Sequence, residues 1–180
     1  YSNYSICESN IKIDDLVNFA EKEKLPAIAL TDYNLLSGAL EFSIKCKKKG
    51  IQPIIGLDVD FISKSKHKSR LTFLSKNNIG FKNLNILSTK INTENDFQLS
   101  LNNINNFSEG NILILGGLFS YFQDLNINTN NLKIILNEIT ALKNLFKNDI
   151  FFEFDENLNN NLLNEISHKS IINSFLSSFS

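Results

Sequence analysis

The sequence is poor in the side chains that build covalent or metal-bound frameworks, with two cysteines and two histidines in 180 residues. Cys7 and Cys46 cannot form the disulfide network of a small secreted domain, so we expect buried free thiols in a reducing compartment. His67 lies in a basic loop and His168 in a late helical segment, where we expect solvent-exposed side chains. There is no zinc-finger spacing, Walker loop or nucleophile elbow. No apolar run reaches the roughly 20 residues that cross a bilayer, so no membrane partner is expected.

The chain also lacks an excess of charge of either sign. It has 18 Lys and Arg residues against 19 Asp and Glu residues, a net charge of -1. A freestanding protein that binds nucleic acid by charge alone is therefore not expected. The 42% hydrophobic content is sufficient for a buried core, and 180 residues fit one domain or part of one. Because the sequence opens on Tyr1 rather than Met, we expect further residues upstream.

Residues 25–58 have the pattern of a strand, a helix and a second strand. The expected elements are a strand at 27–30, a helix within 36–49 and a strand at 54–61. Gly50 follows the basic last turn of the helix and is typical of a left-handed C-terminal cap. Such a crossover joins parallel strands, and function in these folds gathers at the carboxyl ends of the strands. Those ends carry Asp32, Tyr33 and Asp58.

The remaining sequence continues to alternate strands with helices. Further strands are expected at 71–74, 112–115 and 150–154, with the end of another at 1–5, and further helices at 13–24, 81–91, 132–142 and, with an interruption, 158–179. Polar residues 92–111 predict a long surface loop with one helical turn. The helix positions expected to be buried include Leu16, Leu36, Ala39, Leu40, Cys46, Phe81, Leu84 and Leu87. About six strands alternating with helices indicate an α/β fold with a parallel sheet covered by helices.

Five segments carry a more specific signal. They are 25–32 (LPAIALTD), 37–42 (SGALEF), 46–51 (CKKKGI), 53–56 (PIIG) and 74–84 (LSKNNIGFKNL). In order and spacing they resemble the PHP (polymerase and histidinol phosphatase) domain family, in the form found at the N-terminus of bacterial DNA polymerase III alpha subunits. The resemblance implies a distorted TIM-like (β/α) barrel. Because a closed barrel of that kind takes roughly 200–250 residues, we expect residues 1–180 to be an N-terminal fragment of a longer polymerase chain, with the last barrel strands missing.

The resemblance also identifies the positions of a metal site. PHP enzymes hold a cluster of metal ions with His, Asp, Glu and sometimes Cys side chains, and the metals activate a water and clamp a phosphate ester. By position, Tyr1 and Tyr33 replace two of the family's histidines. Asp58 replaces a glutamate, and Arg70 stands where histidine is frequent. A guanidinium repels a metal ion rather than binding it.

We therefore expect a degenerate metal site with no catalytic residue and no bound metal in this domain. Asp32 would instead accept hydrogen bonds from neighbouring backbone N–H groups or from Tyr33. The alternative is one ion held weakly by Asp32 and Asp58.

Two classes of function are compatible with these residues. In the first, the domain is a non-catalytic part of a polymerase alpha subunit. It stabilises the polymerase and binds the separate proofreading exonuclease subunit. The resemblance implies that the parent chain is a DNA-directed DNA polymerase, a nucleotidyltransferase of DNA replication in the cytoplasm. Its downstream polymerase domain would use Mg²⁺ and primer–template DNA. In the second, the domain is an active metal-dependent phosphoesterase or proofreading nuclease with bound Zn, Mn or Fe. Elemental analysis separates the two.

Two further segments carry weaker signals. The basic segment 63–70 would reach the phosphates of DNA, but a solvated loop is the simpler interpretation because no aromatic residue is interleaved. Phe119, Tyr121 and Phe122 would mark a partner surface if they are exposed together.

Overall fold

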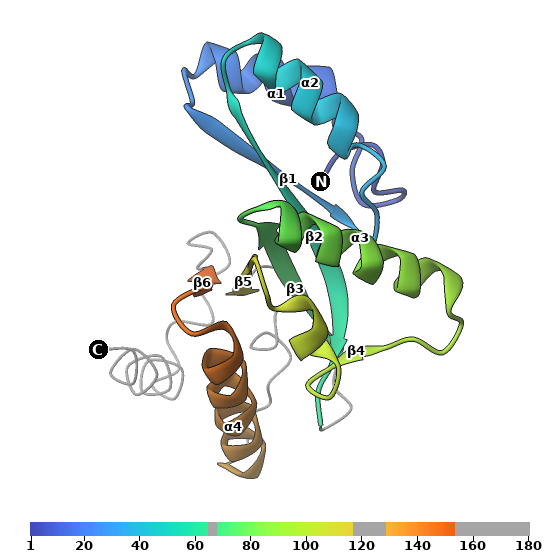
Figure 1. The fold of residues 1–180 in the computed structure, drawn as a ribbon, viewed down its shortest axis with the longest axis vertical. Helices are drawn as coiled ribbons and strands as arrows, with labels where there is room; N and C mark the ends of the chain where they lie inside the picture. Colours follow the sequence, from blue (N-terminus) through green and yellow to red (C-terminus); the bar gives the residue numbers. More distant parts are fainter. Residues whose placement is uncertain (65–67, 117–128, 154–180) are drawn as a thin grey trace.

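The structure is a computed structural model that describes residues 1–64, 68–116 and 129–153 (Figure 1). Its helices are α1 (Ile13–Lys22), α2 (Ala39–Lys48), α3 (Asn78–Thr93), α4 (Thr129–Phe146) and the short 3₁₀ helix η1 (Ile104–Phe107). Its strands are β1 (Ala27–Tyr33), β2 (Gln52–Ile62), β3 (Lys68–Ser75), β4 (Leu99–Ser100), β5 (Asn111–Gly116) and β6 (Ile150–Glu153). The expected helix at 158–179, His67, His168 and the aromatic residues Phe119, Tyr121 and Phe122 lie outside the described residues.

The six strands in the described part of the chain form one mixed sheet. Their order is β1-β2-β3-β5-β6, and the short β4 pairs with the end of β2. β1 and β2 are parallel, as the sequence predicts, and so are β5 and β6. The expectation of a wholly parallel sheet is wrong, because β3 runs antiparallel to both β2 and β5. Only residues 63–67 join β2 to β3, too few for the crossover that a parallel connection needs.

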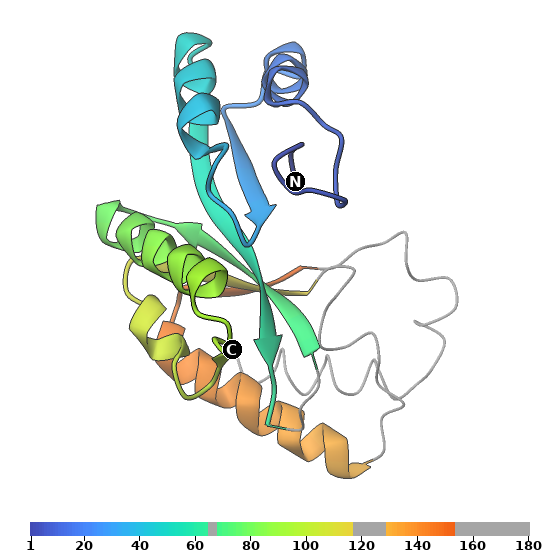
Figure 2. The ribbon, with the colours of Figure 1, turned by 90° about the vertical axis from the view of Figure 1, so that its right-hand side faces the viewer.

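Several element boundaries differ from those expected. Residues 1–5 form turns in the loop before α1 rather than the end of a strand (Figure 2). Within residues 92–111 the predicted helical turn is confirmed as η1, and the sequence did not indicate β4. β1 continues through Asp32 and Tyr33, so these two candidates lie in the strand itself.

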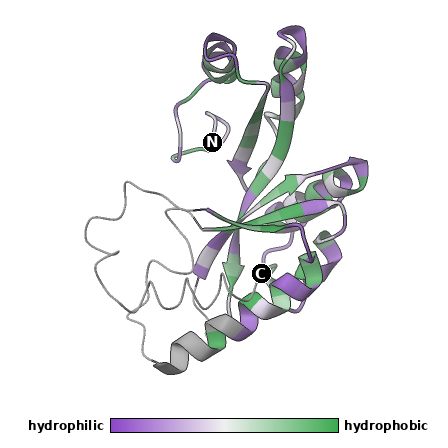
Figure 3. Cartoon of the chain, turned by 90° about the vertical axis from the view of Figure 1, so that its left-hand side faces the viewer, coloured by the Kyte–Doolittle hydropathy of each residue, from purple (hydrophilic) through white to green (hydrophobic). Residues whose placement is uncertain are grey.

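Helices cover the sheet in two groups, each with its own hydrophobic cluster. α1 and α2 lie together against β1 and the first part of β2, and their cluster includes Ile13, Val17, Leu30, Phe42 and Cys46 (Figure 1). α3, η1 and α4 share a larger cluster with the other strands, including Leu57, Phe73, Leu84, Leu113 and Ile139. The strands against which these helices pack are largely hydrophobic, with hydrophilic segments toward some strand ends (Figure 3). Each large side chain buried in this way contributes about 1.5–3 kcal/mol to folding.

Two residues expected inside are exposed, Leu40 by 73% and Phe81 by 39%. α2 begins at Ala39 rather than near Leu36, and its buried residues are Ala39, Phe42 and Cys46. That spacing turns Leu40 to the outer side of the helix. In α3 the buried face is set by Gly80, Leu84 and Leu87, which places Phe81 at its margin.

Candidate functional site

The candidate residues meet where the carboxyl ends of β1 and β2 lie beside the start of β3. The loop of residues 1–12 runs beside the end of β1 (Figure 2). The parallel register places Tyr33 opposite Asp58, and the antiparallel register places Arg70 opposite Asp60. Because side chains alternate between the faces of a strand, Asp58 and Asp60 lie on the same face of β2.

Asp32 is the centre of a first hydrogen-bond group. It is 2% exposed, and its carboxylate accepts from the backbone N–H of Ser2, from the Ser2 hydroxyl at 2.7 Å and from the Ser5 hydroxyl at 2.8 Å. The Ser5 oxygen accepts in turn from the backbone N–H of Tyr33 at 2.9 Å. Of the partners expected for Asp32, the backbone N–H is confirmed. The Tyr33 phenol instead donates to Asp60 at 2.8 Å.

Arg70 is the centre of a second group, which we call the Arg70 cluster. Its Nη2 lies 2.7 Å from Oε1 of Glu8, and its Nε lies 3.5 Å from Oδ1 of Asp60. Its Cζ lies 4.0 Å from the centroid of the Tyr33 ring, in cation–π contact. Burial disfavours the guanidinium charge, but hydrogen bonds led by the one to Glu8 raise the pKa of Arg70 overall. The same bond lowers the pKa of Glu8.

Asp58 completes the Arg70 cluster and is 4% exposed. The Tyr1 hydroxyl donates to its Oδ2, and the Thr72 hydroxyl donates to its Oδ1 at 2.8 Å. Nη1 of Arg70 lies 3.5 Å from the Tyr1 hydroxyl and 4.0 Å from Oδ2 of Asp58. Burial raises the pKa of Asp58, whereas the bonds from Tyr1 and Thr72 and the charge of Arg70 work in the opposite direction.

The two phenols act as hydrogen-bond donors. Burial, followed by the hydrogen bond to Asp58, raises the pKa of Tyr1 above its ordinary value. Burial, followed by the hydrogen bond to Asp60, raises the pKa of Tyr33. Both phenols therefore stay protonated at neutral pH and donate to these carboxylates.

The residues at this position do not fit a cluster of divalent metal ions. Such ions bind deprotonated carboxylates, imidazoles or thiolates with available lone pairs. Here both oxygens of Asp32 and of Asp58 accept hydrogen bonds, and a guanidinium lies among the carboxylates. Within residues 1–64, 68–116 and 129–153, no three His, Cys, Asp or Glu side chains are arranged to hold an ion. That the domain binds no metal stays a prediction.

Sequence reasoning missed five members of the two groups. These are Ser2, Ser5, Glu8, Asp60 and Thr72. Asp60 lies two residues after Asp58, and Thr72 two residues after Arg70, so the two-residue period of a strand would have identified both. The three loop residues follow no periodic pattern, so no sequence signal indicated them.

Two other sequence expectations need correction. Cys46 is buried as expected, but Cys7 is exposed. The segment 63–70 is not a solvated loop throughout, because Ser63 is buried and Arg70 is part of β3. The backbone N–H of Lys64 donates to the buried carboxylate of Glu138 in α4.

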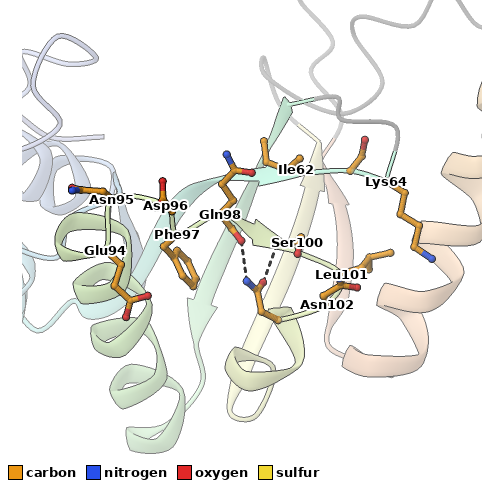
Figure 4. A pocket seen from close by; sticks show the side chains of 12 residues that line it. Ile62, Lys64, Glu94, Asn95, Asp96, Phe97, Gln98, Ser100, Leu101 and Asn102 are labelled. Atoms are coloured by element: carbon orange, nitrogen blue, oxygen red, sulfur yellow. Dashed lines mark hydrogen bonds between the residues drawn. The ribbon is translucent and has the colours of Figure 1, made fainter.

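A separate groove of about 630 Å³ lies beyond the candidate site, where β2 ends at Ile62 beside β4 (Figure 4). It is lined by residues 62–64, 94–98 and 100–103, most of them polar. Asn103, one of the lining residues, holds the backbone of two others: its side chain accepts from the N–H of Ser100 and donates to the carbonyl of Gln98, both at 2.9 Å. None of the candidate site residues lines this groove.

A family model and curated relatives both match most of the chain. The family model of the PHP domain matches residues 1–157. The DNA polymerase III subunit alpha of Chlamydia pneumoniae is 34% identical over 166 residues, covering 85% of this chain and 13% of that protein. The DNA polymerase III subunit alpha of Borreliella burgdorferi is 32% identical over 169 residues, covering 85% of this chain and 14% of that protein. The chain thus spans about one seventh of the length of these relatives.

A solved structure is similar in fold. A Bifidobacterium adolescentis protein described as a metal-dependent phosphoesterase matches with a TM-score of 0.52 at 7% identity, covering 81% of this chain and 72% of that one. This likeness confirms the α/β fold class and carries no information about ligands. No helix within the described ranges is long and apolar enough to span a membrane.

Proposed function

We propose, from the premise that this chain belongs to the PHP domain family, that residues 1–180 are the PHP domain of a DNA polymerase III alpha subunit. The two relatives of that name, which are similar over 85% of the chain, support this assignment. The parent chain is then a DNA-directed DNA polymerase, a cytoplasmic nucleotidyltransferase of DNA replication. Its Mg²⁺ and its primer–template DNA bind in a polymerase domain downstream of residue 180.

The PHP domain itself is proposed to be non-catalytic, and the Arg70 cluster is the observation that carries this proposal. A PHP phosphoesterase needs metal ions to activate water and to neutralise the phosphate. Here a permanent cation lies 4.0 Å from the ring of Tyr33 and 2.7 Å from a carboxylate oxygen of Glu8. Its charge and the protonated phenols oppose metal binding at the positions where the family's ligands would stand.

We further propose that the domain stabilises the polymerase and docks the proofreading exonuclease subunit. The support is that the framework is intact while the ligand set is not. Gly50 has the positive φ of a left-handed cap, at +69°. Gly56 lets β2 approach β3 so closely that a Cβ there would lie 2.4 Å from the carbonyl oxygen of Phe73. A fold that keeps such close packing without a metal site suits a structural role.

Metal content tests the non-catalytic assignment. We expect the full-length chain, purified without added metal, to contain no stoichiometric Zn, Mn or Fe by plasma mass spectrometry. We also expect a chelator to leave its melting temperature unchanged, because hydrogen bonds and not metal ions hold the site. A metal-loaded PHP phosphoesterase treated in parallel is the positive control. A cluster of bound ions together with hydrolysis of a phosphate ester would instead establish the phosphoesterase alternative.

Capture of the exonuclease subunit tests the docking role. The full-length chain is expected to retain the exonuclease in a pull-down, and deletion of residues 1–180 is expected to weaken the affinity at least about tenfold, a loss of about 1.4 kcal/mol. Primer extension by the deleted chain at reduced temperature is the control that its polymerase domain remains folded. Undiminished capture by an active deleted chain would place the docking surface elsewhere.

A further inference from the structure

Arg70 is the only arginine among the 18 Lys and Arg residues of the chain. Lysine thus supplies every other positive side chain, including those of the surface ion pairs formed by Lys45, Lys49, Lys76 and Lys90. Arginine and lysine carry the same charge but differ in shape, because the guanidinium is a planar fork with five donors and the ammonium is a compact point charge. Arg70 is thus the one position at which the chain carries a planar cation with five donors.

The surroundings of Arg70 use that shape. One edge of the guanidinium donates to Glu8, its Nε faces Asp60, and its Cζ lies over the Tyr33 ring. These partners come from the loop of residues 1–12, from β2 and from β1 respectively. The Arg70 side chain is only 15% exposed, so its partners rather than water supply most of its contacts.

We propose that Arg70 is the resident cation of this site: it takes the place of a metal ion, balances the carboxylates of Glu8, Asp58 and Asp60, and fastens the loop of residues 1–12 to the sheet. This inference rests on the proposed loss of the metal site and adds what has replaced it. The position of the guanidinium closes the end of β2 to divalent cations and to the phosphate esters that they would bind. The cluster is therefore an internal clasp.

The clasp joins the loop to β3 through the ion pair between Glu8 and Arg70. Near its start the loop has bonds of its own, from Ser2 and Ser5 to Asp32, from Tyr1 to Asp58, and from the N–H of Asn3 to the carbonyl of Ile11 at 2.8 Å. A loop without regular secondary structure opens more readily than a strand or helix when one of its attachments is lost. The ion pair with Arg70 attaches the loop to β3 at Glu8, between these bonds and Ile11, so we expect the amides of Ser2, Asn3 and Tyr33 to lose protection when the ion pair is removed.

Hydrogen exchange of the full-length chain tests this proposal. In an Arg70→Ala variant the amides of residues 2, 3 and 33 are expected to exchange about 10- to 100-fold faster than in the parent, because hydrogen bonds to charged groups are lost. Arg70→Lys is expected to exchange as fast as Arg70→Ala, since an ammonium is a compact point charge that cannot contact Glu8, Asp60 and the Tyr33 ring at once. Millimolar ethylguanidinium is expected to restore protection in Arg70→Ala, whereas methylammonium at the same concentration is not.

Two further variants keep the experiment decisive. Lys76→Ala removes an exposed ion pair with Asp149 and should leave exchange in residues 1–12 unchanged. Glu8→Gln keeps Arg70 in place and should still speed exchange in the loop, so the proposal is tested even if Arg70→Ala does not fold. Parent-like exchange in Glu8→Gln, or parent-like protection in Arg70→Lys, would overturn the clasp. Neither result bears on metal content, so failure of the clasp is distinguishable from failure of the non-catalytic assignment.

Discussion

Replacing Asp32 with alanine is expected to lower the free energy of opening at the carboxyl end of β1 by about 4 kcal/mol. The carboxylate accepts three hydrogen bonds from Ser2 and Ser5, and all three residues are buried. A hydrogen bond to a charged acceptor contributes about 1.5–3 kcal/mol, and a buried donor left unpaired adds a desolvation cost. Native-state hydrogen exchange of the amides in β1, with the variant and the parent measured side by side, gives this free energy directly.

Two companion variants separate charge from shape. Asp32→Asn keeps the volume but directs an amide N–H₂ toward donors, so we expect a loss close to that of Asp32→Ala. Ser9→Ala removes a half-buried hydroxyl of the same loop, which donates to the Tyr1 carbonyl and accepts from the Ile11 N–H, both at 3.2 Å, and should cost about 1 kcal/mol, well below the loss in Asp32→Ala. Full stability in Asp32→Asn would mean that the carboxylate charge does not hold the loop.

Local patterns predicted most of the framework. The apolar runs that became β1, β2, β5 and β6 lie between polar or glycine residues, and the left-handed conformation of Gly50 follows from its place after a basic last turn. The direction of β3 was not predicted, because an alternation of strands and helices does not reveal which connection is too short for a crossover. The exposure of Leu40 was missed for a related reason, since a shift in the start of α2 changes which residues face the sheet.

In the candidate site, too, some features were predicted from the sequence and others were not. Tyr1, Asp32, Tyr33, Asp58 and Arg70 were identified from motif positions, and the structure places all of them around the ends of β1 and β2. Their present partners were not identified, because contacts such as Arg70 with Glu8 depend on the path of an irregular loop. Such a path is fixed by tertiary hydrogen bonds rather than by periodicity.

Replacing Gly80 with alanine is expected to destabilise the chain by about 3 kcal/mol, at the upper end of typical overpacking costs. A Cβ at this position would lie 1.9 Å from the carbonyl oxygen of Gly110 and 2.6 Å from Oδ1 of Asn111. The nearest atom belongs to the backbone, so no side-chain rotation relieves the contact. α3 must therefore move away from the start of β5, which withdraws Leu84 and Leu87 from the larger hydrophobic cluster.

Gly50→Ala is the matched control for that substitution. Gly50 has a φ of +69° but no neighbouring atom within 4 Å of an added Cβ, so alanine there meets backbone strain alone, about 1–2 kcal/mol. Urea unfolding followed by the exchange of amides in α3 and β5 measures both variants. Equal losses of unfolding free energy in the two variants would show that α3 can move away from Gly110 without a packing cost.

A shift of α3 should also be felt at the end of β1. Ser88 and Asn92 of α3 donate to the carbonyl of Asn34 at 2.8 and 2.9 Å, directly after Tyr33. Because Tyr33 carries the ring on which Arg70 lies, Gly80→Ala is expected to loosen the Arg70 cluster although it changes none of its residues. Faster exchange at the amide of Tyr33 in Gly80→Ala, with no change there in Gly50→Ala, is the expected result. Exchange at Tyr33 that does not respond to Gly80→Ala would mean that α3 does not help to hold Tyr33 in the cluster.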